Sequence, residues 1–379
     1  MNTNRIKRLT LGALLVTALA SATVLLTSAG DDDNQGGQND ENTFSVALWG
    51  DMPYIKNGTP WTTELQVTTL ISDINKQKVA FSVFDGDIKS GSSFCDNSQY
   101  SNAVARFNAL KSPAVYVPGD NEWTDCHRKN NAAAAPGYNA LERLSYIRTT
   151  MFNSVNSFGQ KTMKLDHQGL PGQPYSENTR WVKNHVMFVG LNIPGSDNNY
   201  ITTCIDSKSY RTQPDCDADN LEYAERNARN LEWIQQSFTL AKQNNVAGIM
   251  FVIQADPGFD IPETAAFERH PGPSMTTTDP TNYQHFTDTL KELRAQTVAY
   301  SGQVVLVHGD THAYTVDKPL LMPFPADSPA SPDGPYHALP NFTRVETFGE
   351  SNADWIRVTV DARTRNVFRF EPMIVPGNH

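Results

Sequence analysis

Short apolar segments rich in β-branched and aromatic residues recur along this chain, and each stops at a small polar cluster. Such segments are typical of buried β-strands, and they lie at residues 44–49, 79–84, 114–117, 247–253 and 304–307. Further strands are predicted at residues 179–182, 186–191, 343–348, 355–360 and 367–370, the last of them antiparallel. Helices are predicted at residues 62–75, 99–110, 219–243 and 283–299, with Asp219 as the N-cap of the third. This alternation predicts an α/β protein with a sheet at its core.

Five of the predicted strands end in residues that can ligate a cation. These residues are Asp51, Asp87, Asp120 with Asn121, Gln254 with Asp256, and Asp310 with His312. Ligands of open α/β sheets bind beyond the carboxyl ends of the strands. A single Gly-Asp pair indicates no more than a turn, but five polar clusters in the same context indicate a shared site. Carboxylates gathered there would repel one another, and bound cations are the simplest way to neutralise them.

These stretches resemble the motifs of the calcineurin-like metallophosphoesterase superfamily. The matching stretches are Gly50-Asp51-Met52-Pro53, Gly86-Asp87, Gly119-Asp120-Asn121-Glu122, Gln254 before Pro257, and Gly309-Asp310-Thr311-His312. The resemblance extends from residue 44 to about residue 370 in order and context, with partial identity inside the motifs. It implies that residues 43–379 form a four-layer α/β/β/α sandwich of mixed sheets.

The resemblance also implies the ligands of a first metal. Asp51, Asp87 and His312 match ligands of that metal unchanged, and Asp87 would bridge to a second one. The His of the first motif is replaced by Pro53, which has no ligating side chain. The first site therefore loses one nitrogen ligand.

The second metal would be held by oxygen alone. Asp120 replaces an Asn of the family, and Gln254 and Asp310 each replace a His. Carboxylate and amide oxygens suit hard cations better than Zn²⁺, which prefers His and Cys. The expected cofactors are therefore divalent ions, two in number, with Mg or Mn favoured and Ca or Fe as alternatives.

The activity that the resemblance implies is hydrolysis of a phosphate ester by a metal-activated water. Asn121 stands where the family has its proton-donating His, and it cannot donate a proton as an imidazolium does. His127 and His308 are the candidate replacements, and for each the alternative is a structural role. Lys89 could contact a phosphate, but a solvated surface position is favoured. The expected partner is a small-molecule or macromolecular phosphate ester.

The charge of the chain argues against a general nucleic-acid-binding function. The net charge is -10, from 31 basic and 41 acidic residues. Such a chain gains nothing from counterion release on DNA or RNA. It would also repel anionic substrates unless cations reverse the local field.

The N-terminal region predicts export. Arg5, Lys7 and Arg8 precede an apolar run at residues 9–29, which resembles a secretory signal. The alternative is an uncleaved membrane anchor, and only then is membrane association expected. Residues 30–42 form an acidic linker that is expected to be disordered, leaving residues 43–379 as the catalytic domain.

Four cysteines in an exported chain predict two disulfides, with three connectivities open. A Cys204–Cys216 bond would close a short loop, and a Cys95–Cys126 bond would join the loops after Asp87 and Asn121. Free buried thiols are the alternative.

Three functions compete. The first is a secreted metal-dependent phosphoesterase. The second is a catalytically degenerate protein that keeps the fold and binds a ligand without turnover. The lost His residues motivate this hypothesis. The third is a membrane-anchored structural or adhesion module, which requires that the N-terminal segment be retained.

Overall fold

The computed structural model describes residues 42–56, 59–259, 284–323 and 336–379. The predicted signal segment, residues 1–29, lies outside the described residues, as does all of the linker except Asn42. The described residues belong to one compact unit. No helix in the described ranges is long and apolar enough to cross a membrane.

Two mixed β-sheets form the centre of this unit. The smaller has the order β16-β15-β1-β4-β5, with β1 (Thr43–Trp49), β4 (Phe81–Phe84), β5 (Ala114–Tyr116), β15 (Trp355–Asp361) and β16 (Phe368–Met373). The larger has the order β11-β14-β10-β9-β8-β7-β6, with β6 (Asp166–His167), β7 (Thr179–Lys183), β8 (Val186–Gly190), β9 (Gly248–Val252), β10 (Gln303–His308), β11 (Thr315–Asp317) and β14 (Phe342–Glu346). Strands β1, β4 and β5 run parallel, as do β8, β9, β10 and β14. The predicted antiparallel pairing of the last strands is confirmed for β15 and β16, whereas β14 pairs in parallel with β10 and antiparallel with β11.

The two sheets pack face to face through alternate residues of their strands. In β1, Val46 and Leu48 enter the core between the sheets, while Ala47 and Trp49 point to the opposite face. Strand β9 divides in the same way, with Met250 between the sheets. This period of two is what a strand buried on both faces produces.

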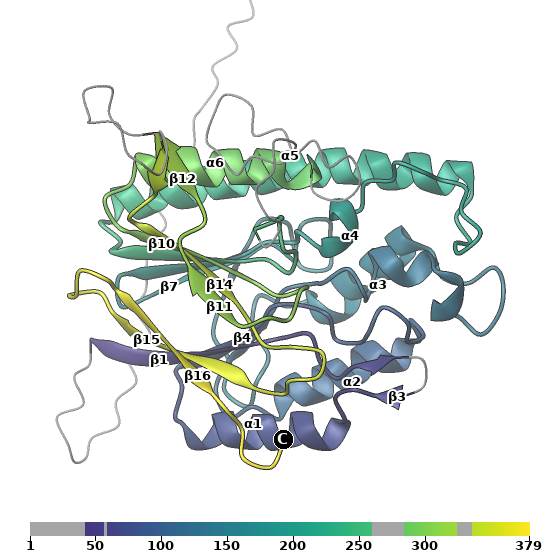
Figure 1. Cartoon of the computed structure of the whole chain (residues 1–379), viewed down its shortest axis with the longest axis horizontal. Coiled ribbons are helices and arrows are strands. Elements are labelled where there is room, and N and C mark those ends of the chain that lie inside the picture. The colour runs from purple at the N-terminus through teal and green to yellow at the C-terminus, as the bar shows by residue number, and fades with distance from the viewer. Residues whose placement is uncertain (1–41, 57–58, 260–283, 324–335) are drawn as a thin grey trace, which may run out of the picture. The chain divides into compact units, whose positions relative to one another are not determined.

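Helices cover the outer faces of both sheets (Figure 1). On the smaller sheet lie α1 (Glu64–Lys76), α2 (Asn97–Asn108) and α3 (Ala140–Met151), which share its outer apolar core. On the larger sheet lie α5 (Gln213–Gln243) and α6 (Thr287–Val298). The predicted four-layer α/β/β/α sandwich is confirmed.

Helix α1 shows how local sequence places a helix on a sheet. Thr63 caps its first turn, and its hydroxyl accepts from the Gln66 backbone N–H while the Gln66 side chain accepts from the Thr63 N–H. The buried residues Val67, Leu70 and Ile74 recur at helical spacing and face the sheet.

Two helices differ from the prediction. Helix α3 was not predicted, and its buried face includes a charged residue, Arg143, which breaks the apolar stripe. Helix α5 begins well before Asp219, the expected N-cap. Its cap is Thr212, in a capping box with Asp215, and Asp219 lies inside the helix and binds Arg211 at 2.6 Å.

The remaining elements are short. They are β2 (Ile55–Lys56), β3 (Thr59–Pro60), β12 (Leu321–Pro323), β13 (Tyr336–Ala338), α4 (Gly195–Asn198) and the 3₁₀ turns η1 (Thr124–His127), η2 (Lys129–Asn131) and η3 (Gln284–Phe286). Disulfides join Cys95 to Cys126 and Cys204 to Cys216, which is one of the three connectivities that the sequence allows.

Candidate active site

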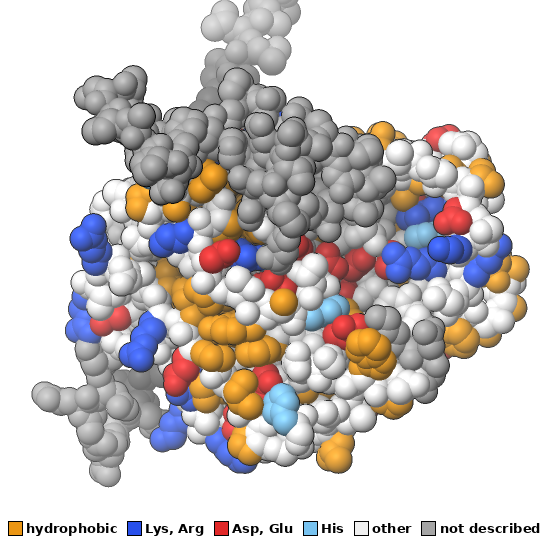
Figure 2. Space-filling model, viewed as in Figure 1, with side chains coloured by type: hydrophobic (Ala, Val, Ile, Leu, Met, Phe, Trp, Pro, Cys, Tyr) orange, Lys and Arg blue, Asp and Glu red, His pale blue; other side chains and the backbone are white. Residues whose placement is uncertain are grey.

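The carboxyl ends of the parallel strands of both sheets meet around a hollow of about 600 Å³, which we call the acidic hollow. Its lining residues are Tyr54, Asp87, Ser90, Gly91, Ser92, Asp120, Asn121, Asp125, Arg128, Asn130, Gly195, Ser196, Asp197, Asp256, Phe286, Asp310, His312 and Glu350. Figure 2 shows acidic side chains gathered near the middle of the face drawn, beside the residues in grey. The predicted strand-end residues are therefore brought together, with Asp51 and Gln254 fully buried beside the hollow.

At three of the strand ends, those after β1, β4 and β10, site residues have a left-handed backbone. Asp51, Asp87, Asp310 and His312 all have positive φ, at 53°, 61°, 71° and 65°. Non-glycine residues seldom adopt this left-handed region, and such residues concentrate at functional sites.

A hydrogen-bond network joins the two carboxylates of the predicted first metal site. The Tyr54 hydroxyl donates to Asp87 Oδ2 at 2.6 Å and lies 3.4 Å from Asp51 Oδ1. Asn121 donates its backbone N–H to Asp87 Oδ1 at 3.1 Å, and its side-chain amide donates to Asp87 Oδ2 and to the Tyr54 hydroxyl. Asp87 therefore accepts hydrogen bonds on both of its oxygens.

The other half of the hollow comes from the larger sheet. His312 Nε2 lies 3.2 Å from Asp51 Oδ1, and His312 Nδ1 lies 3.7 Å from Glu350 Oε2. The Asp310 backbone N–H donates to Asp51 Oδ1 at 3.3 Å. Asp51 thus connects strand ends from both sheets.

Asp120 is held by a serine, Ser196, that no sequence pattern singled out. Ser196 Oγ lies 2.7 Å from Asp120 Oδ2 and 2.8 Å from Asp125 Oδ1. Arg128 binds Asp125 at 2.5 Å and donates to Ser196 Oγ at 3.2 Å. The Ser196 hydroxyl therefore lies directly beside the Asp120 carboxylate and connects it to the Arg128 guanidinium.

Two glycines permit the close approach of these groups. A Cβ on Gly119 would lie 2.1 Å from Asp87 Oδ1, and one on Gly195 would lie 2.8 Å from Asp310 Oδ2 and 3.1 Å from Asp120 Cγ. Any side chain at either position would displace a carboxylate.

Gln254 is turned so that its carbonyl oxygen accepts from the Gly195 N–H at 2.6 Å, while its Nε2 has no hydrogen-bond partner. A carbonyl oxygen has two lone pairs, so Oε1 retains one for a cation.

Burial and mutual repulsion raise the pKa values of the carboxyl groups. Burial raises the pKa of Asp87 and of Asp310 well above the usual range, and the Asp120 carboxylate raises both further. Burial together with the Asp125 carboxylate raises the pKa of Asp120 to about 7. Burial alone would lower the pKa of His312, but the carboxylates of Asp51, Glu350 and Asp310 together outweigh burial and raise that pKa to about 9. Carboxylates in this state gain most from a nearby cation.

The donor set fits a hard divalent cation. Asp51 Oδ2 and Asp120 Oδ1 are buried and accept no hydrogen bond, and a buried carboxylate oxygen without a partner is costly. Within the described ranges, no three Asp, Glu, His or Cys side chains already converge on one point. Tyr54 and Asn121 instead occupy the free positions on Asp87.

The two histidines predicted as proton donors do not line the hollow. His127 Nδ1 contacts the Thr124 carbonyl at 2.6 Å and His127 Nε2 lies 3.0 Å from Arg211 Nη1. His308 is fully buried, with Nδ1 3.0 Å from the Gly309 carbonyl. The structure brings Asn121 to the site but neither of these imidazoles.

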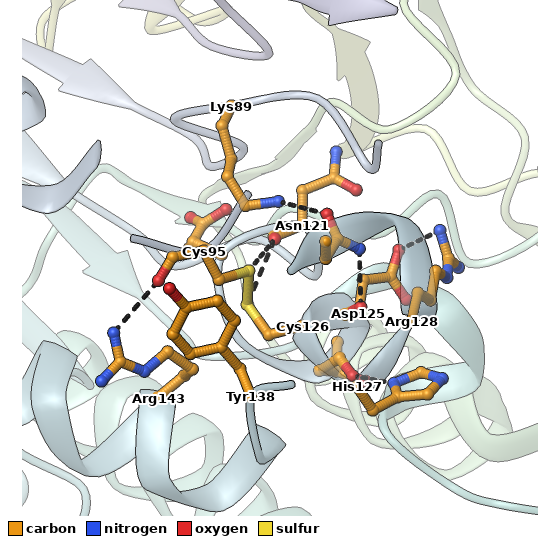
Figure 3. The surroundings of a disulfide bond; sticks show 12 residues. Lys89, Cys95, Asn121, Asp125, Cys126, His127, Arg128, Tyr138 and Arg143 are labelled. Carbon is orange, nitrogen blue, oxygen red and sulfur yellow. Dashed lines mark hydrogen bonds and ion pairs between the residues drawn. A yellow bond between two sulfur atoms is a disulfide. The ribbon is translucent and has the colours of Figure 1, made fainter. Parts of the chain in front are cut away.

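Lys89 differs from its favoured interpretation as a solvated surface residue. It is buried, and its ammonium donates to the Ser90 carbonyl at 3.0 Å and to Asn131 Oδ1 at 3.2 Å. Burial lowers its pKa to about 8. Lys89 is therefore a buried positive charge, and Figure 3 shows it in the surroundings of the Cys95–Cys126 disulfide.

No family model matches the sequence, and no curated protein does. Among solved structures, the chain is similar to a dimetal phosphatase from Danio rerio, with 12% identity and a TM-score of 0.45 over 88% of this chain and 99% of that one. It is also similar to a purple acid phosphatase from yellow lupin seeds, with 10% identity and a TM-score of 0.42 over 87% of this chain and 53% of that one. A 5′-nucleotidase from Candida albicans has 11% identity and a TM-score of 0.39 over 86% of this chain and 50% of that one.

Proposed function

We propose that this chain is a metal-dependent phosphoesterase whose active site is the acidic hollow. One observation carries the proposal: acidic residues from strand ends far apart in the sequence meet there, and two of their buried oxygens, on Asp51 and Asp120, have no partner. A purely structural cluster would be expected to satisfy these oxygens with hydrogen bonds. A cation satisfies them and offsets the repulsion between the carboxylates.

The residues divide into two candidate sets of ligands. Asp51, Asp87 and His312 would hold a first ion, and Asp120, Asp310 and Gln254 would hold a second with Asp87 shared. Divalent ions so bound would acidify a water and stabilise the charge on phosphoryl oxygens. Mg or Mn is the expected metal because all but one of these ligands is oxygen.

Neither Asn121 nor Tyr54 is suited to protonate the leaving group. The Asn121 amide is engaged by Asp87 and the Tyr54 hydroxyl, and it carries no acidic proton. Burial and the Asp87 carboxylate raise the pKa of Tyr54 well above its usual value, so its hydroxyl keeps its proton at neutral pH. The site therefore suits esters whose alcohol leaves without protonation, such as aryl phosphates, over alkyl phosphates.

The test is hydrolysis of p-nitrophenyl phosphate by chelated protein to which Mg, Mn, Ca or Zn is added singly. Mg or Mn should restore most activity, and Asp87→Asn should lower kcat/KM by at least ~100-fold. Asp217→Asn, the same change at an exposed position on α5, is the matched control and should leave activity unchanged. Activity that is absent with every metal, or unaffected by Asp87→Asn, would overturn the proposal.

A second candidate is a protein of this fold that binds without turnover. It is favoured by the fact that His312 is the one imidazole among the described lining residues. Calorimetric binding of Mn to the chelated protein, without hydrolysis of the aryl ester, would identify this case.

We further infer that the protein is exported. The basic residues Arg5, Lys7 and Arg8 before an apolar run, and the two disulfides, support this. Mass spectrometry of the mature N-terminus would detect cleavage within or just after residues 9–29, and an intact N-terminus in the membrane fraction would contradict it.

A further inference from the structure

The acidic hollow contains one guanidinium. Among its described lining residues, Arg128 is the one Lys or Arg, against seven carboxylates. A phosphate ester entering this hollow would be repelled by those carboxylates wherever a cation does not intervene. Arg128 is therefore placed where an anionic substrate needs a positive charge that the protein itself supplies.

Arg128 is held in place by contacts that do not engage all of its hydrogen-bond donors. Its Nη1 binds the buried Asp125 carboxylate at 2.5 Å, its Nη2 donates to Ser196 Oγ at 3.2 Å, and its side chain is 40% exposed. A guanidinium has five N–H donors, so these two contacts leave others free to face the hollow. Figure 3 shows the pairing of Arg128 with Asp125.

A glycine makes room for this guanidinium. A Cβ on Gly91 would lie 3.1 Å from Arg128 Nη1 and 2.6 Å from Asn121 Oδ1. The side chain therefore lies against bare backbone between the loop after β4 and the segment that carries Ser196.

The segment that carries Ser196 is strained, and a buried network holds it. Residues Ser196 to Asn199 have φ values of 48°, 52°, 58° and 66° in succession, a left-handed run that is unfavourable for residues other than glycine. Arg226 binds Asn198 at 2.6 Å, and Arg211 binds Asn199 at 3.3 Å. A strained run held from several sides is characteristic of a functional segment.

Ser196 places Arg128 next to a proposed metal ligand. Its hydroxyl contacts Arg128 on one side, at 3.2 Å, and Asp120 on the other, at 2.7 Å. A single phosphoryl group can therefore reach an ion on Asp120 and the guanidinium together.

We propose that Arg128 binds a non-bridging phosphoryl oxygen of the substrate and makes the site selective for phosphomonoesters over phosphodiesters. This inference depends on the proposed function and deepens it. A monoester has three non-bridging oxygens and a charge of nearly −2, whereas a diester has two such oxygens and a charge of −1. If two oxygens contact the ions, only a monoester has a third left for Arg128, and Arg binds phosphate in fixed geometry.

The test compares p-nitrophenyl phosphate with bis-p-nitrophenyl phosphate in the wild type, Arg128→Met and Arg128→Lys. Arg128→Met should lower kcat/KM for the monoester by ~100-fold, comparable to the loss of one transition-state donor, and change the diester by less than about threefold. It should also raise the inhibition constant of inorganic phosphate at least ~10-fold. Arg128→Lys should recover part of the loss. Arg229→Met, which removes an exposed arginine of α5 paired with Glu232, is the matched control.

Several outcomes would overturn the inference while leaving the proposed function intact. One is an equal loss on both esters in Arg128→Met, and another is no loss on either. The wild type tests the inference without any variant, because a kcat/KM higher for the diester than for the monoester contradicts it. If the wild type hydrolyses neither ester, the proposed function fails. Calorimetric binding of inorganic phosphate to the Mn-loaded protein then decides the role of Arg128, which is contradicted if Arg128→Met binds as tightly as the wild type.

Discussion

At the residue scale, the positions directly after a strand are the informative ones. Asp51, Asp87 and Asp310 each follow a buried strand within a few residues, and all three adopt positive φ. The end of a strand determines where the residue directly after it lies. These three residues could therefore be predicted from the sequence as members of one site. Their shared site follows from the parallel course of the strands in each sheet.

His127 illustrates the limit of sequence proximity. It stands six residues after Asn121, which made it a candidate acid, yet it lies in η1 with its ring between Thr124 and Arg211. Burial and the Arg211 guanidinium lower its pKa from 6.5 to about 4. A proton donor at neutral pH needs a higher value.

We expect His127→Gln to affect stability and not catalysis. Between pH 6.5 and 4 the unfolded chain binds a proton at His127 that the folded chain does not, so stability falls as pH falls through this window. The variant should lose up to about 3 kcal/mol of this acid dependence. Urea unfolding at pH 7 and pH 4.5 measures it.

The same variant should keep kcat/KM for p-nitrophenyl phosphate within about threefold of the wild type, because loss of a general acid costs ~10²–10⁴. A larger loss of kcat, together with loss of the alkaline limb of the pH–rate profile, would contradict this prediction and indicate that His127 acts as a general acid.

Ser196, Arg128 and Tyr54 could not be predicted with the same means. Ser196 lies in α4, where its backbone is left-handed, and Arg128 lies between η1 and η2. Both reach the hollow through contacts with residues distant in sequence, such as the 2.7 Å approach of Ser196 to Asp120. Tyr54 follows Asp51 closely, but this proximity alone gives it no role in the site. Its hydrogen bond to Asp87 depends on the neighbouring strand β4.

At the element scale, apolar periodicity located the strands and most of the helices. It failed for α3, whose buried face includes Arg143, and for the first turns of α5, where the buried Asp219 pairs with Arg211 just before the helix. Buried charges interrupt the apolar pattern on which such predictions depend. They are satisfied by partners that no local pattern reveals.

The Cys95–Cys126 disulfide connects the two loops that shape the hollow. Both sulfurs lie 3.7 Å from the Asn121 carbonyl, and the bond closes a separation of 31 residues. Removing this bond therefore raises the conformational entropy of the unfolded chain. It also loosens the segment that carries Asn121.

We expect Cys95→Ala with Cys126→Ala to lower the free energy of unfolding by about 3–4 kcal/mol and kcat/KM by at least ~10-fold. Removal of the Cys204–Cys216 bond, with a separation of 12 residues, is the control and should cost about 3 kcal/mol with little effect on kcat/KM. Urea unfolding and aryl phosphate hydrolysis measure both effects. Equal loss of activity in the two double variants would show that the first bond has no special relation to the site.

At the scale of the whole molecule, the sandwich buries a charge that its own residues do not neutralise. The two sheets converge on Asp51, Asp87, Asp120 and Asp310, and the pKa values of the last three are raised by burial and by neighbouring carboxylates. The order of the motifs indicated this convergence. The length and course of the connecting loops, which place Arg128 and Ser196, depend on the folded sheets and were not readable from the sequence.

This arrangement predicts how pH and metal act together on stability. For Asp120 the folded pKa is about 7 against 3.8 when unfolded, so its folded form binds the proton more tightly. Its contribution to stability is complete below pH 3.8 and is lost as pH rises through 7. In the presence of a chelator, ionisation of the cluster should therefore destabilise the protein progressively between pH 4 and 8.

A divalent cation should reverse this loss, because it binds the ionised cluster of the folded chain and stabilises it by about 2.7 kcal/mol at a concentration of 100 Kd. The rise in Tm on adding Mn to chelated protein should be several degrees at pH 8 and much smaller at pH 5, where protons compete for the carboxylates. In Asp120→Asn the chelated protein should lose less stability with rising pH and gain less from Mn, whereas Asp217→Asn should behave like the wild type. A Tm that is independent of Mn at pH 8, or a gain that is the same in Asp120→Asn, would show that the carboxylates of both sheets meet for a reason other than holding a cation.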